Sequence, residues 1–245
     1  DKIRIDEKTM LKLNYLVEVE KEPLEKVAYN FLLQKGIVAE GSKPILRHPI
    51  IRQTIEHLRL TLFATLIAIL IAVPLGIYIS YRPKLSNAIL ATTGVIQTIP
   101  SLALLGFMIP LFGIGFTPAI IALFLYALLP IVRNTYAGLQ NTDPILIEAG
   151  RALGMTRWQI LRMVRLPLSA SFIMAGIRTA LTINIGTATL AAFIGAGGLG
   201  ESIITGINLN DNSLIFQGAI PAALLALLAD WGMGLMEKKI RVRVE

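Results

Sequence analysis

Long apolar runs without a charged side chain dominate the chain beyond Arg59. A helix that crosses the hydrocarbon core of a bilayer needs about 20 mostly apolar residues. Four runs without Asp, Glu, Lys or Arg meet or approach that length: residues 60–81, 85–132, 179–200 and 212–229. The second run is long enough for two helices, so the pattern predicts an all-α integral membrane protein with five spans. We place the spans at about residues 57–80, 86–111, 117–133, 169–194 and 214–236.

The first 45 residues carry a different pattern, typical of a soluble segment. EPLEKVAYNFLLQKG at 22–36 predicts an amphipathic helix with Pro23 in its first turn and Gly36 as its cap. LVEVE at 16–20 alternates apolar and polar residues, which predicts a short strand. We therefore expect a mixed α/β segment too small for a core of its own, followed by a linker at 41–44.

Composition agrees with a membrane protein and supplies few groups for catalysis. The chain is 54% hydrophobic and 16% charged, with a mean hydropathy of +0.66, whereas soluble domains are about one quarter charged. There is no cysteine, and the two histidines, His48 and His57, lie at or before the start of the first span. We expect no metal site and no cofactor in this chain. A membrane-embedded enzyme would need clustered acidic residues or histidines, yet away from their ends the spans offer only Arg178 and Asp230.

Charge outside the spans indicates orientation. Residues 1–45 hold eight basic and eight acidic side chains, so the net charge of +7 belongs to the membrane part. Such charge usually reports topology rather than nucleic-acid binding, and basic loops tend to be cytoplasmic. With five spans, three basic segments fall on one side: residues 82–84, 151–165 and 238–243. We expect that side to be cytoplasmic, with the N-terminus outside. Three arginines on the predicted outer side oppose this assignment: Arg47, Arg52 and Arg59.

The sequence begins at Asp1, with neither Met nor a secretory signal, and we expect a fragment or a processed chain.

One stretch, EAGRALGMTRWQILRMVRLP at 148–167, interrupts the apolar pattern. Thr142 or Asp143 can cap a helix here, and Gly154 would end it. A second amphipathic helix is predicted at 156–164. We expect two short helices that lie beside the membrane.

This stretch resembles the EAA loop of ABC-importer permeases. The family pattern is Glu-Ala-Ala, three residues, Gly, nine residues and Ile-x-Leu-Pro. Here Glu148-Ala149-Gly150 precedes Gly154, and Val164-x-Leu166-Pro167 follows after nine residues. The departures, Gly for Ala and Val for Ile, are mild. IQTIPSLALLGF at 96–107 and TATLAAFIGAGGLG at 187–200 are also similar to segments of that group. The resemblance covers about residues 50–240 and implies the five-span type I importer fold.

The resemblance also implies how the protein is driven. Residues 142–167 would form a coupling loop that docks on a cytosolic ATPase, with Pro167 restarting the chain as span 4. Glu148 would pair with a basic group of the ATPase, and Ala149 and Gly150 would permit close approach. Gly154 would bend the turn, and Leu166 would close the motif together with Pro167. Because the chain has no GxxxxGK[ST] motif, ATP and Mg²⁺ belong to the partner, of which we expect two copies. A second permease copy completes the path.

Polar and small residues inside the spans are the candidates for the translocation path or its gate. They are Gln97, Thr98, Pro100, Ser101, Asn184, Thr187, Thr189, Gly195, Gly197, Gly198 and Gly200. For the first four the alternative is a packing kink, for Asn184 and the threonines it is interhelical bonding, and for the glycines it is a simple turn. Arg178 is either functional or reaches toward the inner surface, and we expect Asp230 to be structural.

The branch that imports quaternary ammonium compounds is the most similar part of this superfamily: glycine betaine, choline, carnitine and ergothioneine. MAGIRTAL at 174–181 carries this resemblance, and residues 8–36 are similar to the C-terminal end of that branch's substrate-binding domains. We therefore predict such a tail with its linker at 1–45 and a permease domain at 46–245, in a bacterial cytoplasmic membrane. A methionine or other amino-acid permease, and a non-transporting membrane anchor, are the alternatives.

Overall fold

The structure is a computed structural model that describes residues 5–20, 22, 24–38 and 49–242. The chain divides into two compact units, Asp1–Pro49 and Ile50–Glu245. The predicted linker at 41–44 and the predicted boundary after residue 45 lie outside the described residues. Each unit is described by itself.

The N-terminal unit consists, in its described part, of two helices, α1 (Glu7–Glu18) and α2 (Leu24–Gln34). The Asp6 carboxylate caps α1 by accepting the Thr9 N–H at 3.1 Å. Hydrogen bonds from the Thr9 side chain and then from its N–H lower the pKa of that carboxyl. The predicted strand at 16–20 is wrong, since its first three residues complete α1. An apolar–polar alternation of only five residues is too short to end a helix that already has a good N-cap. The described residues contain no strand.

Helix α2 confirms the amphipathic helix predicted within 22–36. Val27 is its buried apolar residue, at 3% exposed. Gly36 takes a positive φ of 66°. The Gly36 N–H bonds the Leu33 carbonyl at 3.0 Å and the Ile37 N–H bonds the Leu32 carbonyl at 3.0 Å. These two bonds form the Schellman cap that the glycine predicts.

The membrane unit is wholly helical in its described part. Its main helices are α3 (Pro49–Ile79), α4 (Pro83–Thr98), α5 (Ser101–Phe112), α6 (Phe116–Gln140), α9 (Leu166–Ala188) and α11 (Asn212–Val242). Shorter elements are α7 (Pro144–Ala152), α8 (Arg157–Ile160), the π-helical turn η1 (Leu161–Arg165), the 3-10 turn η2 (Leu190–Ile194) and α10 (Gly200–Asn208). Among the described helices four can cross a membrane, or five if α4 and α5 count as one broken span.

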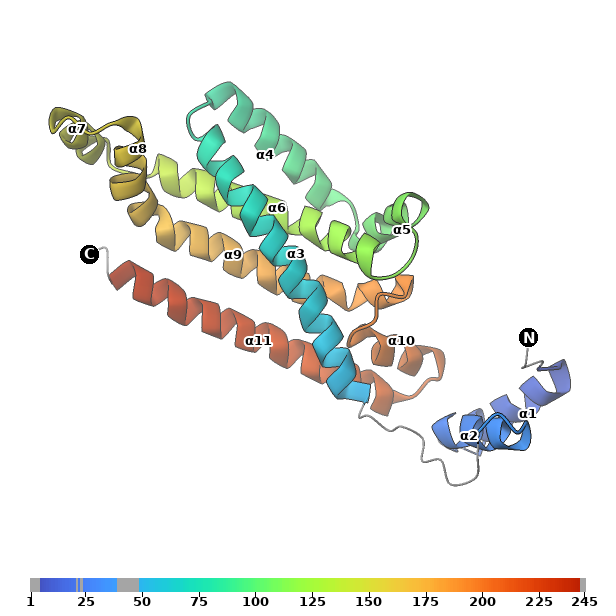
Figure 1. Cartoon of the computed structure of the whole chain (residues 1–245). Coiled ribbons are helices and arrows are strands. Elements are labelled where there is room, and N and C mark those ends of the chain that lie inside the picture. Colours follow the sequence, from blue (N-terminus) through green and yellow to red (C-terminus); the bar gives the residue numbers. More distant parts are fainter. Residues whose placement is uncertain (1–4, 21, 23, 39–48, 243–245) are drawn as a thin grey trace. The chain divides into compact units, whose positions relative to one another are not determined.

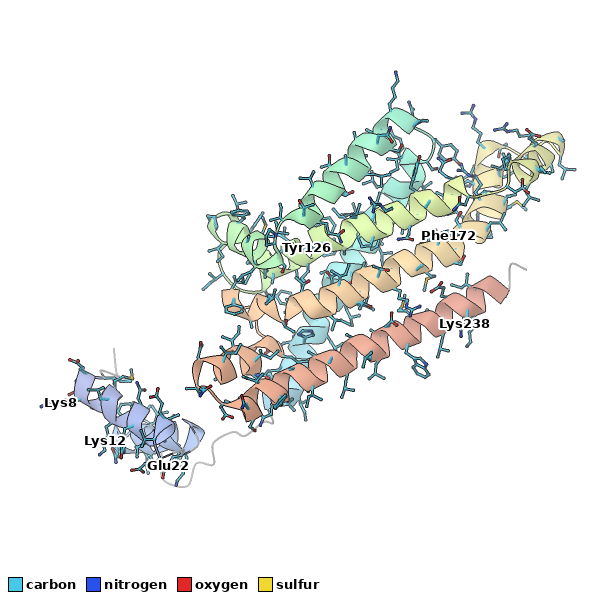
Figure 2. The ribbon with its side chains drawn as sticks, turned by 180° about the vertical axis from the view of Figure 1, so that it is seen from behind. Lys8, Lys12, Glu22, Tyr126, Phe172 and Lys238 are labelled. Atoms are coloured by element: carbon cyan, nitrogen blue, oxygen red, sulfur yellow. The ribbon has the colours of Figure 1, made fainter. Side chains whose placement is uncertain are left out.

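The break in the second span lies where the sequence predicts it. Helices α4 and α5 meet at an angle of 98° across Ile99 and Pro100. A residue before proline disfavours helical geometry, and Ile99 is extended, with φ −66° and ψ 127°. The Tyr126 hydroxyl of α6 donates to the Ile99 carbonyl, so the freed backbone group finds a partner within the protein. Figure 2 labels Tyr126 beside this break.

The long helices form a layer that α3 crosses. Figure 1 shows α4, α6, α9 and α11 side by side in that order, with α3 running across one face. Helix α6 lies between α4 and α9. It is the most buried of the candidate spans, with 61% of its apolar stretch buried inside the protein. Along α3, Ala64, Ala68 and Ala72 are fully buried. At Gly76 an added Cβ would lie 2.7 Å from the Thr135 Cβ of α6, so small residues let α3 approach its neighbours closely.

Residues 157–188 form one continuous helix, which corrects the predicted restart at Pro167. The N–H of Leu166 bonds the Leu161 carbonyl, five residues back, in the π-helical turn. Proline lacks an N–H and its ring clashes with the carbonyl four residues earlier in a regular helix. The widened π turn just before Pro167 relieves that conflict, so the second helix of the loop and the fourth span are a single rod.

Candidate functional site

Two ends of the membrane unit hold the candidate residues. We call them the α7 end and the α10 end, after the short helix that each carries (Figure 1). At the α7 end, the Gln140 amide of α6 donates to the Ser80 carbonyl at 2.9 Å, so α3 and α6 end together. At the α10 end, the Gly115 N–H donates to the Ile194 carbonyl at 2.7 Å, so the start of α6 meets the end of α9 and η2.

The predicted coupling segment, residues 142–167, begins with a strongly capped helix. The Asp143 carboxylate accepts the Ile145 N–H at 2.8 Å, and Pro144 takes the first helical position of α7. Gly154 ends α7 with a φ of 78°. The N–H groups of Gly154 and Met155 bond the carbonyls of Arg151 and Gly150 at 2.9 and 3.0 Å, which completes a Schellman cap. The predicted end of the first helix at Gly154 is confirmed.

A second cap follows the first at once and turns the chain into α8. Thr156 and Gln159 form a reciprocal capping box, with the Gln159 N–H 3.3 Å from the Thr156 hydroxyl and the Thr156 N–H 2.7 Å from the Gln159 side chain. Gly150 is buried in the resulting corner. A Cβ there would lie 3.2 Å from Met155 Sδ and 3.4 Å from Ile160 Cγ1. The small residue at 150 therefore serves packing of α7 on α8, a use that the motif alone did not indicate.

The outer surface of the segment is apolar and open. Glu148, Ala149 and Gly154 are exposed. Large apolar side chains are exposed beside them: Ile145 70%, Leu146 44%, Leu153 82%, Trp158 65% and Met163 66%. Leu166 is half-buried and Pro167 exposed on the rod that carries the segment. Several large exposed apolar side chains on one short segment, with charged neighbours, favour a protein-binding face.

Arg165 anchors this segment to the bundle. It is only 8% exposed, donates from Nη2 to the Leu139 carbonyl at 2.7 Å, and stacks on the Tyr81 ring at 4.8 Å from the ring centroid. One side chain thereby joins the coupling segment to the ends of α6 and α3. Sequence reasoning counted Arg165 only as a basic loop residue, and no signal in its spacing separates it from its exposed neighbour Arg162.

Of the four candidates around the α4–α5 break, two are exposed and two are half-buried. The Gln97 amide lies 3.4 Å from the Tyr126 carbonyl, and Thr98 is exposed with its hydroxyl bonded to the Val95 carbonyl at 2.7 Å. Pro100 is exposed and Ser101 half-buried at the start of α5. The kink is confirmed, and a role of these residues in the path stays a prediction.

The polar candidates of span 4 divide between the interior and the surface. Asn184 is fully buried, and its amide donates to the Thr65 hydroxyl of α3 at 3.0 Å. This is an interhelical bond. Thr187 is half-buried, and Thr189 donates to the Gly186 carbonyl at 2.7 Å within its own turn. Beside Asn184, His57 of α3 bonds the Ile185 carbonyl at 3.0 Å, so a polar stripe ties α3 to α9.

The glycine candidates build a tight turn between η2 and α10. Gly195, Gly197 and Gly198 have φ values of 72°, 81° and 87°, a region that other residues adopt at a cost. At Gly200 an added Cβ would lie 1.9 Å from the Thr189 carbonyl oxygen. Both features require glycine, so the turn interpretation is confirmed. Gating by this turn stays a prediction.

A charged cluster that the sequence did not reveal fastens α3 to this turn. We call it the α10 clamp: Arg52, Gln53 and Glu56 of α3 with Gly198, Glu201 and Ser202. Arg52 bonds Glu56 at 2.9 Å and Glu201 at 2.8 Å. Glu56 accepts the Gly198 N–H at 3.2 Å, and Ser202 donates to Gln53 at 2.7 Å. The four-residue spacing of Arg52 and Glu56 was a usable signal for their pair.

The two charged residues inside the predicted spans bind each other. Arg178 Nε and Nη2 lie 2.6 Å and 2.6 Å from the two carboxylate oxygens of Asp230, a bidentate pair between α9 and α11. The expectation of a structural Asp230 agrees with this contact. The Arg178 side chain is 35% exposed, and both alternatives for it, a functional role and a reach toward the inner surface, stay predictions.

Known proteins resemble this chain over most of its length. A family model described as "Binding-protein-dependent transport system inner membrane component" matches residues 53–242. The carnitine transport permease protein OpuCB of Listeria monocytogenes is 49% identical over 193 residues, 79% of this chain and 88% of the relative. The glycine betaine/carnitine/choline transport system permease protein OpuCB of Bacillus subtilis is 46% identical over 188 residues, 77% of this chain and 87% of the relative.

A solved structure has the same fold. A chain of the MetNI methionine ABC transporter, in an inward-facing conformation, superposes with a TM-score of 0.72 at 25% identity, covering 81% of this chain and 99% of that one. This confirms the predicted all-α type I ABC-importer permease fold. The chain belongs to the family of inner-membrane components of binding-protein-dependent transport systems, and is a transporter permease subunit rather than an enzyme.

Proposed function

We propose that the chain forms the membrane path of an ATP-driven importer for quaternary ammonium osmoprotectants such as glycine betaine, choline and carnitine. The observation that carries this proposal is the identity of 49% and 46% to permeases named for these compounds, over nearly nine tenths of their lengths. The methionine transporter shares the fold at 25% identity, so the amino-acid alternative has the weaker support.

The predicted coupling segment is the element through which we infer that the path is driven. Its two caps hold α7 and α8 at a fixed corner, and its apolar surface is open for a partner. We propose that two cytosolic ATPases, which carry ATP and Mg²⁺, each receive one such segment from two copies of this chain. Glu148 is exposed at the tip and is the group proposed to pair with a cation of the ATPase. The α8–α9 rod then carries the motion into the bundle as a two-state rearrangement.

Orientation follows from charge. The α7 end carries the exposed basic residues Arg82, Lys84 and Arg151, and we infer that it faces the cytoplasm. The α10 end and the N-terminal unit then lie outside, where residues 1–45 are proposed to be the tail of a substrate-binding domain. Arg52, which opposed this orientation by sequence, has two carboxylate partners in the α10 clamp, so it adds no net positive charge to that end.

Uptake tests the substrate. The full transporter, expressed in bacteria that lack their own osmoprotectant importers, should accumulate radiolabelled glycine betaine, choline or carnitine against a gradient. Labelled methionine in parallel cultures tests the amino-acid alternative. Accumulation of methionine without any of the three quaternary compounds would overturn the assignment.

A charge reversal tests the coupling segment. Glu148→Lys should reduce uptake at least tenfold while the permease reaches the membrane at the normal level, because the exposed side chain supports no described contact within the chain. Asp143→Lys is not a suitable control, since Asp143 caps α7. Lys84→Glu, a charge reversal of the same size and opposite sign on an exposed residue at the same end, is the control and should leave uptake near the parent level.

A further inference from the structure

Arg178 has a second carboxylate within reach besides Asp230. Its Nη1 lies 3.5 Å from Glu237 Oε2, while Nε and Nη2 bind Asp230. Both acidic residues belong to α11. They are seven residues apart, so they lie on one face of that helix about 10 Å apart along its axis. The Arg178 guanidinium therefore lies between two carboxylates of α11. It is close to Asp230 and at the limit of hydrogen-bond distance from Glu237.

The backbone of α11 is shaped around this guanidinium. Gly234 lies between the two acidic residues on the same face, and a Cβ there would come within 3.2 Å of Arg178 Nη1. Glycine inside a helix is destabilising relative to alanine, so such a residue indicates a packing demand. Here the missing side chain leaves the corridor between Asp230 and Glu237 open to the arginine.

Neutralisation of Arg178 requires only one carboxylate. A charge within a membrane span is expensive and is normally paired, and the bidentate bond to Asp230 already supplies that pair. Glu237 is therefore not needed to neutralise Arg178 in the observed arrangement. A second acceptor on the same helix face gives the arginine a partner after α9 has shifted along α11, without ever leaving the charge unpaired.

We propose that Arg178 is a positioning residue that fixes the register of α9 on α11, and that its guanidinium passes from Asp230 to Glu237 when the transporter changes state. The inference rests on the proposed importer function, because α9 is the continuation of the rod that carries the predicted coupling segment. A shift of that rod by a fraction of a helical turn would exchange the two partners. The helices then have two defined registers, as a two-state mechanism requires.

Glu237→Gln is the decisive variant, because it preserves the bond between Arg178 and Asp230. In the complete transporter, reconstituted with its ATPase and binding protein, we expect uptake to fall about tenfold and the stimulation of ATPase activity by the loaded binding protein to be lost. Glu237→Asp should restore part of both. Lys238→Gln, on the adjacent exposed residue at the same end of α11 (Figure 2), is the control and should behave as the parent.

Stability in two trapped states separates exchange from a merely structural role. The apparent unfolding temperature is measured without nucleotide and with ATP and vanadate. Asp230→Asn should lower it mainly in one state and Glu237→Gln mainly in the other. Normal uptake by Glu237→Gln, or destabilisation of the same state by both variants, would overturn the proposal. If the parent transporter imported none of the quaternary compounds, the substrate assignment would fail, while the stability comparison would still decide the exchange.

Discussion

The two ends of α3 are fastened to the bundle in different ways. At the α10 end two ion pairs join partly exposed side chains, Arg52 53%, Glu56 30% and Glu201 34%, beside a buried bond from Ser202 to Gln53. At the α7 end Arg165, only 8% exposed, binds a backbone carbonyl of α6 and the ring of Tyr81. The ion pairs at the α10 end are therefore partly solvated, whereas the cation at the α7 end is buried.

This difference predicts which end yields first. Exposed ion pairs contribute about 0.2–1 kcal/mol each, because water screens both partners. A buried cation that loses its partners leaves an unsatisfied group behind, which costs several times more. We infer that α3 and the predicted coupling segment move as one body at the α7 end, and that the ion pairs of the α10 clamp can break and re-form at small cost.

The glycine turn is the strongest exception to a soft α10 end, and its removal should give the largest effect. In Gly200→Ala the new Cβ would lie 1.9 Å from the Thr189 carbonyl oxygen, a backbone atom that cannot step aside. We expect a loss of more than about 3 kcal/mol, seen as failure to purify as a monodisperse complex in detergent. Gly186→Ala in α9, with no atom within 4 Å of its Cβ and no positive φ, is the control and should retain a folded protein. A well-folded Gly200→Ala protein would mean that the turn adapts.

Removal of the buried cation should come next. Arg165→Ala loses a charged hydrogen bond and a cation–π contact, together worth about 3 kcal/mol. We expect a clearly lower unfolding temperature of the solubilised complex and weaker coupling of ATP hydrolysis to uptake. Arg162→Ala removes the same charge from an exposed position one turn earlier and should change neither quantity much. Equal effects of the two variants would show that net charge, rather than the buried contact, matters at this end.

Features that depend on local sequence were predictable. The five spans, the break at Ile99–Pro100 and the end of α7 at Gly154 follow from apolar runs, a proline and a glycine, each acting within a few residues. The strand at 16–20 and the restart at Pro167 were wrong. In each case a short local signal was overruled by the helix around it, once through a good N-cap and once through a π turn.

The fastenings themselves depend on distance in space and were not predictable. Arg52 and Glu201 are 149 residues apart, and nothing in either neighbourhood indicates the other. Arg165 and Arg162 have the same charge and nearly the same neighbours, yet only Arg165 is buried. Topology rules count both as cytoplasmic charges. Only the packing of α3, α6 and α9 decides which arginine carries structure.

A smaller effect should follow from a substitution that strains the turn between α7 and α8. Gly154→Ala adds a side chain in open space, so its cost comes only from the φ of 78°, about 1–2 kcal/mol. Gly154→Asn should cost less, because asparagine adopts this conformation more readily. The measurement is the unfolding temperature together with uptake. If alanine and asparagine were equally harmful, a contact made by position 154 with the partner ATPase, and not backbone strain, would be the cause.

The smallest effect should come from the clamp. Arg52→Ala removes two ion pairs, but because all three groups are partly exposed we expect a loss of about 1 kcal/mol or less in stability. The difference in stability between parent and variant should shrink when NaCl is raised from about 0.1 M to about 1 M, because the screening length falls from about 10 Å to about 3 Å.

Arg59→Ala, another exposed arginine of α3 without an ion pair among the described contacts, is the control. The α10 clamp also holds the glycine turn. We therefore expect Arg52→Ala to change substrate transport, through leakage or slower uptake, more than it lowers stability. An Arg52→Ala protein as unstable as Arg165→Ala would erase the contrast between the two ends, and α3 would then be rigidly held along its whole length.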